Sequence, residues 1–97
     1  MGFVSLKDWR ARSAALAEAA RRAKALLAPA LGLTEEDALS VNEIACNHST
    51  CPGVETVVLI MRWGEPTRAL RRPCGLAAIT EADVAALVAE EAALRGA

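Results

Sequence analysis

The stretch SVNEIACNHSTCPGVETVVLIMRW, residues 40–63, decides the fold of this chain. Its longest apolar run, Val57 to Met61, is rich in β-branched side chains and predicts a central strand over residues 55–63, covered on at least one face. Residues 40–46 alternate between apolar and polar side chains, which indicates a shorter strand with one partly wet face. The four residues 47–50 join the two strands, so we expect an antiparallel hairpin.

A third strand follows this hairpin. Gly64-Glu65-Pro66 breaks the apolar run, and residues 67–72 then resume an extended pattern up to Pro73. Proline has no backbone N–H to donate to a sheet, and it restricts the residue before it to extended geometry. We therefore expect the third strand to end there or to lie at an edge, so that the sheet spans residues 40–73.

Residues 5–28 predict a long helix ahead of the sheet. Ser5 is a suitable N-cap, and Pro29 is expected to end the helix. Its buried stripe should consist of apolar and small residues that recur at spacings of four and three, namely Trp9, Ser13, Leu16, Ala20, Ala23 and Leu27. Most of its basic side chains lie off this stripe, which indicates a solvated face.

A second helix is predicted over residues 80–95. Thr80 is its expected N-cap, Asp83 follows at the third helical position, and Ile79 can pack on Val84 as a hydrophobic staple. Gly96 is expected to stop the helix. The predicted buried side consists of Val84, Leu87, Val88 and Leu94.

These elements predict a single α+β domain over residues 1–97, in the order α-β-β-β-α. Short connections favour a three-stranded antiparallel meander with both helices packed on one face of the sheet. The other face of the sheet is then less covered. If side chains from the second and third strands share that face, they form an anion-binding patch, for which the candidates are Arg62, Arg68, Arg71 and Arg72.

Composition excludes several classes of function. Eleven Lys and Arg against twelve Asp and Glu give a net charge of −1, which provides no global attraction to nucleic acid or to an anionic membrane. The three aromatic residues, Phe3, Trp9 and Trp63, do not make a stacking platform for single-stranded nucleic acid. No run of apolar residues is long enough for a membrane span, and the start of the chain has no signal core, so we expect a cytoplasmic protein.

Cys46 and Cys51 flank the four-residue loop of the hairpin. A loop of that length can set them directly opposite one another, with Cα atoms about 4.5–5.5 Å apart, which a disulfide accepts. The pair is therefore a candidate reversible dithiol.

The same hairpin offers metal ligands and nucleophiles. Cys46, His48, Cys51 and Cys74 together could hold zinc or iron in a tetrahedral thiolate and imidazole site. His48 beside Cys46 or Cys51 could also act as the base of a thiol nucleophile, which makes these three the catalytic candidates. Glu43 and Glu55, on the two strands behind the loop, could lie near each other across the ladder and share a proton or a cation.

The segments NEIAC, residues 42–46, and CPGVETV, residues 51–57, resemble a set of short bacterial proteins of uncharacterised function that share a Glu-x-x-Cys-x4-Cys-Pro-x-x-Glu-Thr pattern. The likeness extends loosely to the final helix, TEADVAAL, and leaves the N-terminal helix outside. The resemblance implies no named activity. The positions that match the pattern, and that form the candidate site, are Glu43, Cys46, Cys51, Pro52, Glu55 and Thr56.

These observations favour a small cytoplasmic binding or accessory module without catalytic function of its own. It would act through the cysteine hairpin and the helix-free face of the sheet, on an unknown protein partner or on itself. Two alternatives stay open. One is a thiol-dependent enzyme that uses Cys46 or Cys51, and the other is a purely structural protein that forms homo-oligomers through the first helix or a sheet edge.

Overall fold

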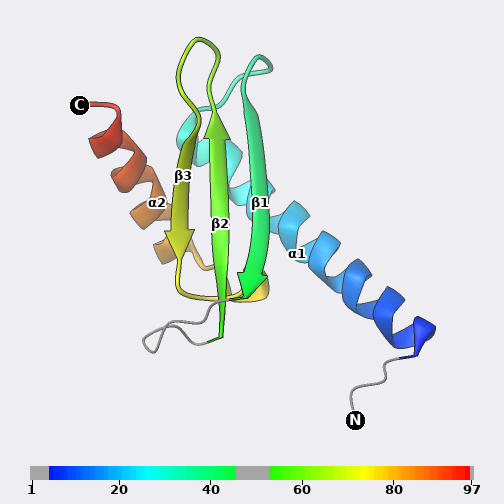
Figure 1. Ribbon diagram of the computed structural model, residues 1–97. Coiled ribbons are helices and arrows are strands. Elements are labelled where there is room, and N and C mark those ends of the chain that lie inside the picture. Colours follow the sequence, from blue (N-terminus) through cyan, green and yellow to red (C-terminus); the bar gives the residue numbers. More distant parts are fainter. Residues whose placement is uncertain (1–4, 46–52, 97) are drawn as a thin grey trace.

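The computed structural model describes residues 5–45 and 53–96. Figure 1 shows the predicted α+β order, with two helices and a three-stranded antiparallel sheet. The elements are α1 (Leu6–Leu31), β1 (Ala38–Ala45), β2 (Val54–Met61), β3 (Arg68–Arg72), the 3₁₀ turn η1 (Leu76–Ala78) and α2 (Glu81–Leu94). The prediction of an α-β-β-β-α meander is therefore confirmed.

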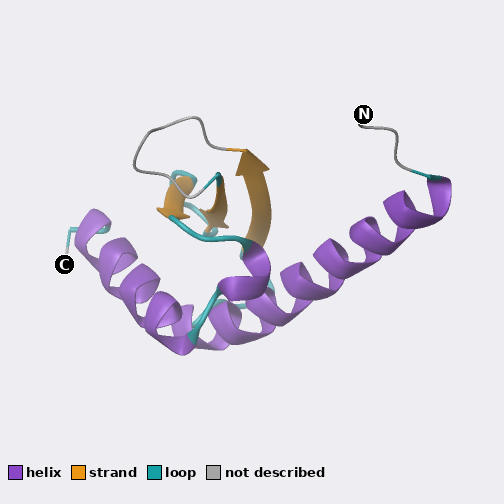
Figure 2. Cartoon of the chain, turned by 90° about the horizontal axis from the view of Figure 1, so that it is seen from below, coloured by secondary structure: helices purple, strands orange, loops and turns teal. Residues whose placement is uncertain are grey.

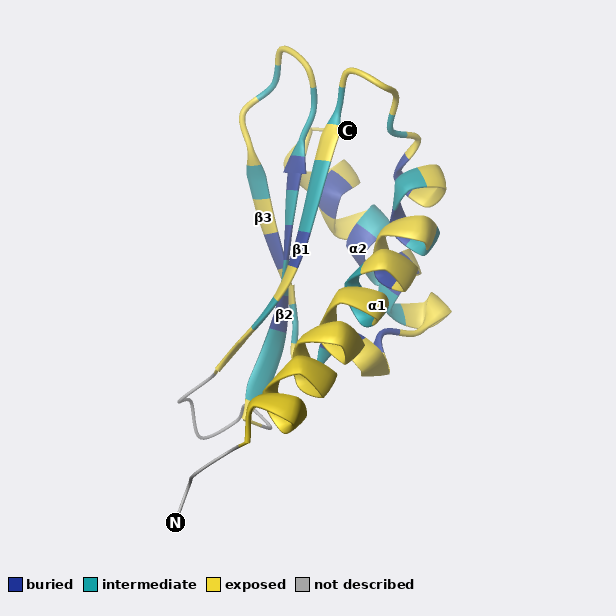
Figure 3. Cartoon of the chain, turned by 90° about the vertical axis from the view of Figure 1, so that its right-hand side faces the viewer, coloured by how far each residue is buried: buried dark blue, intermediate teal, exposed yellow. Residues whose placement is uncertain are grey.

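The sheet has the order β1-β2-β3, so the apolar strand β2 is central. Val58 of β2 lies between Val41 of β1 and Leu70 of β3, and all three are buried. Both helices lie on this side of the sheet, as Figure 3 shows. The core between the layers consists of Ala23, Leu27, Leu31, Val41, Val58, Ile60, Leu70, Leu76, Ile79, Val84 and Leu87.

Pro29 does not end α1, which corrects the sequence prediction. The helix continues to Leu31 and ends at Gly32, whose φ of 68° is the left-handed conformation that favours glycine. The N–H of Leu33 then donates to the Ala28 carbonyl at 3.0 Å and closes the cap. A proline in the last turn loses one backbone hydrogen bond, and the burial of Leu31 in the core offsets that loss.

The first half of α1 extends beyond the rest of the protein, as Figure 2 shows. Ser5 caps it as predicted, accepting a hydrogen bond from the Asp8 N–H at 3.2 Å. The predicted buried stripe is wrong for this half, because Trp9 is 60% exposed and Leu16 is also exposed. At ~1.5 Å per residue, α1 is about 39 Å long, whereas an eight-residue strand spans only about 26 Å. Within the described ranges, no helix is both long and apolar enough to cross a membrane.

The start of α2 is capped as predicted, but its buried side differs from the prediction near the end of the helix. Thr80 caps the helix and forms a reciprocal capping box with Asp83. Leu94 is exposed, however, and Glu91 is buried in its place on the inner side of the helix. A carboxylate can occupy this position because the Arg62 guanidinium reaches it from the sheet, as described below.

Candidate functional site

The predicted cysteine site lies largely outside the described residues. Cys46, His48 and Cys51, which carry the dithiol, catalytic and metal hypotheses, all fall in the range 46–52. The last described pair of the hairpin is Ala45 with Val54. Among the described residues, no group of three or more His, Cys, Asp or Glu side chains could hold a metal ion. The dithiol and the zinc or iron site therefore stay sequence predictions.

The base of the hairpin is described, and it anchors the loop that follows β3. The Thr56 hydroxyl is fully buried and donates to the Cys74 carbonyl at 2.8 Å. A Glu43 carboxylate oxygen accepts the Leu76 N–H at 2.9 Å. A Cβ on Gly75 would come within 2.8 Å of that same oxygen, so a larger residue there would displace the Glu43 carboxylate. Glu43 and Thr56 thus hold the backbone of the loop.

Glu43 and Glu55 do not share a proton or a cation, because they lie on opposite faces of the sheet. The register pairs Glu43 with Thr56 and Ile44 with Glu55, and successive strand residues point to opposite faces. Glu43 faces the helices, where it binds the loop. Glu55 faces away from them, where its carboxylate pairs with Arg71 at 2.7 Å.

Cys74, the fourth predicted metal ligand, is partly buried against the core. Burial raises the pKa of its thiol, and the neighbouring Asp83 carboxylate raises it further, while Arg72 opposes them. A thiol with a raised pKa stays protonated at neutral pH, whereas the thiolate is the form that attacks electrophiles and binds metal. The environment of Cys74 therefore disfavours a role as a nucleophile.

We expect Cys74 to react slowly. In a Cys46→Ser, Cys51→Ser variant, alkylation of Cys74 by iodoacetamide at pH 7 should be at least about tenfold slower in the folded protein than in the same chain in urea, because both thiolate content and access are reduced. Mass spectrometry of quenched time points measures both rates. Equal rates would contradict this account of the Cys74 environment.

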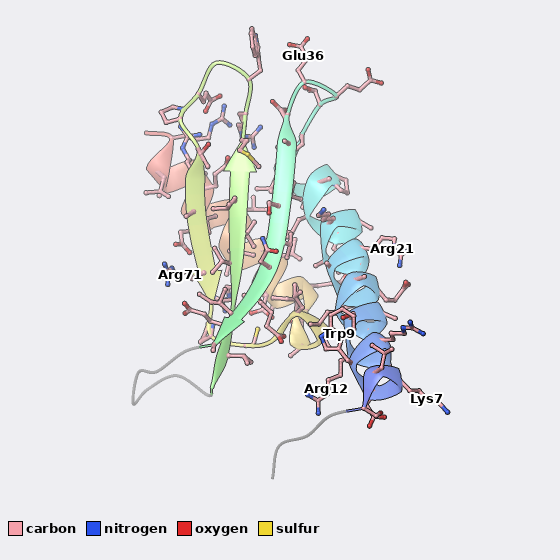
Figure 4. All side chains as sticks on the ribbon, turned by 45° about the vertical axis from the view of Figure 1, so that its right-hand side comes forward. Lys7, Trp9, Arg12, Arg21, Glu36 and Arg71 are labelled. Atoms are coloured by element: carbon pink, nitrogen blue, oxygen red, sulfur yellow. The ribbon has the colours of Figure 1, made fainter. Side chains whose placement is uncertain are left out.

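The structure does not bring the four arginines of the predicted anion patch together. Arg62, Arg68 and Arg72 lie on the side of the sheet that faces the helices. Each pairs with a carboxylate within 2.9 Å: Glu91, Glu65 and Asp83, respectively. Only Arg71 of the four is on the opposite face, where Figure 4 labels it, and it pairs with Glu55. Alternation along β3 separates Arg71 from Arg72, so the four cannot act on one anion.

The sheet face opposite the helices is the remaining candidate for a binding site. We call it the open face. Its residues alternate with the buried ones along each strand: Ser40, Asn42 and Ile44 of β1; Glu55, Val57, Leu59 and Met61 of β2; and Ala69 and Arg71 of β3. Neither described helix covers it, as Figures 2 and 3 both show. The predicted less-covered face is thus present.

The centre of the open face is apolar, and its edge strands carry both polar residues, Ser40, Asn42 and Arg71, and apolar ones, Ile44 and Ala69. Leu59 lies between Ser40 and Ala69, and Val57 lies between Asn42 and Arg71. The side chains of Val57, Leu59 and Met61 are partly exposed along the middle strand. An exposed apolar patch on one face of a sheet is typical of a surface that contacts another macromolecule.

A groove lies between the two helices, and no pattern in the sequence predicted it. The groove has a volume of about 520 Å³ and is lined mainly by Ala, Val and Leu side chains of α1 and α2, with Glu81 as a charged member. Alanines leave this space because they are too short to fill it.

Comparison of the chain with protein-family models, with curated protein sequences and with solved structures gave no match. The resemblance to the short bacterial proteins therefore stays a hypothesis.

Proposed function

We propose that this chain is a small binding module that contacts a protein partner through its open face. The observation that supports this is the row of Val57, Leu59 and Met61, which lies on a sheet surface that neither described helix covers. Antiparallel sheets with one solvated face usually carry polar residues there. Three successive apolar positions on the outer side of the central strand depart from that rule, and burial by a partner accounts for them.

The energetics agree with a binding surface of modest strength. Fully burying a Val, Leu or Met side chain contributes roughly 1.5–3 kcal/mol, and these three are already partly covered by their neighbours. Part of the gain is offset by the lost translational and rotational freedom of the partners. A reversible contact is therefore expected.

Site-specific photo-crosslinking tests this proposal. p-Benzoylphenylalanine in place of Leu59 is expected to give covalent adducts when cells of the source organism that express the chain are irradiated, since the side chain would lie inside the contact. The same residue in place of Glu90, which is exposed on α2, is the control. Gel shifts and mass spectrometry detect adducts, including adducts between two copies of the chain. Adducts at both positions in equal yield, or at neither, would overturn the proposal.

A further inference from the structure

We propose that the protein surface bound by the open face is the open face of a second copy of this chain. This inference rests on the proposed function and names the partner. Two sheets would pack face to face, with a twofold axis lying between them, perpendicular to the strands and level with Leu59. The helices would then form the two outer layers of a four-layer dimer.

The apolar row has the symmetry that such a dimer requires. In an isologous interface, the same patch is used by both subunits and must be complementary to itself. Leu59 lies midway between Val57 and Met61 on the outer side of β2. A twofold axis at Leu59 sets Leu59 against its copy and Val57 against Met61 of the second copy. Apolar side chains therefore meet apolar side chains along the whole row.

The two ends of the open face are also complementary to each other. At one end, Glu55 pairs with Arg71, whose side chain is 62% exposed. At the other end, Trp63 lies just beyond β2 and is 76% exposed. Glu55 is four residues from Leu59, or about 13 Å along the strand, and Trp63 lies in the turn two residues after Met61, the last residue of β2. The twofold axis would bring the turn that carries Trp63 in each copy toward the ion pair of the other, where an indole face can attract an arginine guanidinium.

The same arrangement keeps like charges apart. The two Arg71 side chains lie on opposite sides of the axis, each two residue levels from it, because the axis reverses the strand direction. Each is neutralised by Glu55 of its own chain. The polar residues Ser40 and Asn42 of β1 lie at the rim, where water can reach them.

The size of the open face indicates a weak dimer. Three strands about 4.8 Å apart, over six or seven residue levels of about 3.3 Å, give a face about 10 Å by 20 Å between Cα atoms. With side chains this corresponds to roughly 400–500 Å² per partner, which is at the low end for specific interfaces. We therefore expect a dissociation constant of roughly 1–100 μM, with exchange between monomer and dimer.

Sedimentation equilibrium of the purified full chain, in a reducing buffer that prevents intermolecular disulfides, tests this inference. The average mass is expected to rise from 10.2 kDa toward twice that value as concentration increases from about 1 μM to about 500 μM. Leu59→Glu should weaken association at least about tenfold, because it places two carboxylates at the symmetry axis. Trp63→Ala, at an exposed position, should weaken it several-fold without affecting folding.

Trp9→Glu is the matched control, since Trp9 is similarly exposed but lies on the free half of α1, as Figure 4 shows. It should leave association unchanged. Association that survives both Leu59→Glu and Trp63→Ala, or that is lost with Trp9→Glu, would overturn the inference.

A monomer at every concentration would also overturn it, and the crosslinking result then decides the broader proposal. Adducts with a different protein from position 59 would leave the binding module standing with another partner. An absence of position-specific adducts would remove both proposals.

Discussion

Arg62→Ala is expected to lower the free energy of unfolding by about 3–5 kcal/mol, because it leaves a buried carboxylate without its partner. The guanidinium makes two hydrogen bonds of 2.8 Å to Glu91, and a third, of 2.6 Å, to the Leu31 carbonyl. The two side chains are only 10% and 4% exposed. One arginine from the sheet thus joins α2 and the end of α1, and urea denaturation measures the loss.

Arg71→Ala is the matched control for that change. Its side chain also pairs with a glutamate, but it is largely exposed, so the expected loss is under about 1 kcal/mol. Replacing both buried partners, as in Arg62→Met with Glu91→Leu, should recover most of the stability lost by Arg62→Ala, because no charge is then left buried. Equal losses for Arg62→Ala and Arg71→Ala would contradict this account.

The same ion pair has a predictable dependence on pH. The hydrogen bonds from Arg62 lower the pKa of Glu91, although burial opposes them. A carboxylate whose pKa is lower in the folded state contributes stability above its ordinary pKa, and loses it as the pH falls through the folded value. The difference in stability between the wild type and Arg62→Ala should therefore shrink at pH values below the ordinary glutamate value of 4.5.

Ile60→Ala is expected to cost about 2–5 kcal/mol, whereas Leu59→Ala, one residue earlier on the same strand, should cost under about 1 kcal/mol. Ile60 is fully buried between the sheet and the helices, and its removal leaves a cavity. Leu59 points to the open face, where solvent fills the space. Both unfolding curves should be measured near 1 μM, where dimerisation contributes little. Similar losses for the two variants would show that both faces of β2 are covered in the monomer.

The local parts of this fold were predictable because short-range chemistry determines them. Ser5 caps α1, and Thr80 with Asp83 caps α2, through contacts three residues apart. The β-branched run of β2 and the breaks at Gly64 and Pro73 were enough to predict the order of the strands. The prediction that Pro29 ends α1 was wrong. The loss of a backbone hydrogen bond at a proline can be read from the local sequence, whereas the gain from burying Leu31 depends on residues distant in sequence.

The site was less predictable, because it depends on which residues the helices cover. The free half of α1 carries the same apolar spacing as its buried half, so periodicity could not show that the sheet ends before the helix does. The predicted buried side of α2 did not include Glu91, because its partner Arg62 is distant in sequence. The faces on which the four arginines of the predicted anion patch lie also depend on the register of the strands. The sequence does not show that register.

The amino-acid sequence by itself determined the order of the elements, their caps and the central place of the run from Val57 to Met61. Those signals act over a few residues, through backbone geometry and side-chain shape. The tertiary structure alone decided that the run has a buried side at Val58 and Ile60 and an open side at Leu59. An unbroken apolar run has no period that distinguishes its two faces, so the docking of both helices on one side makes the distinction.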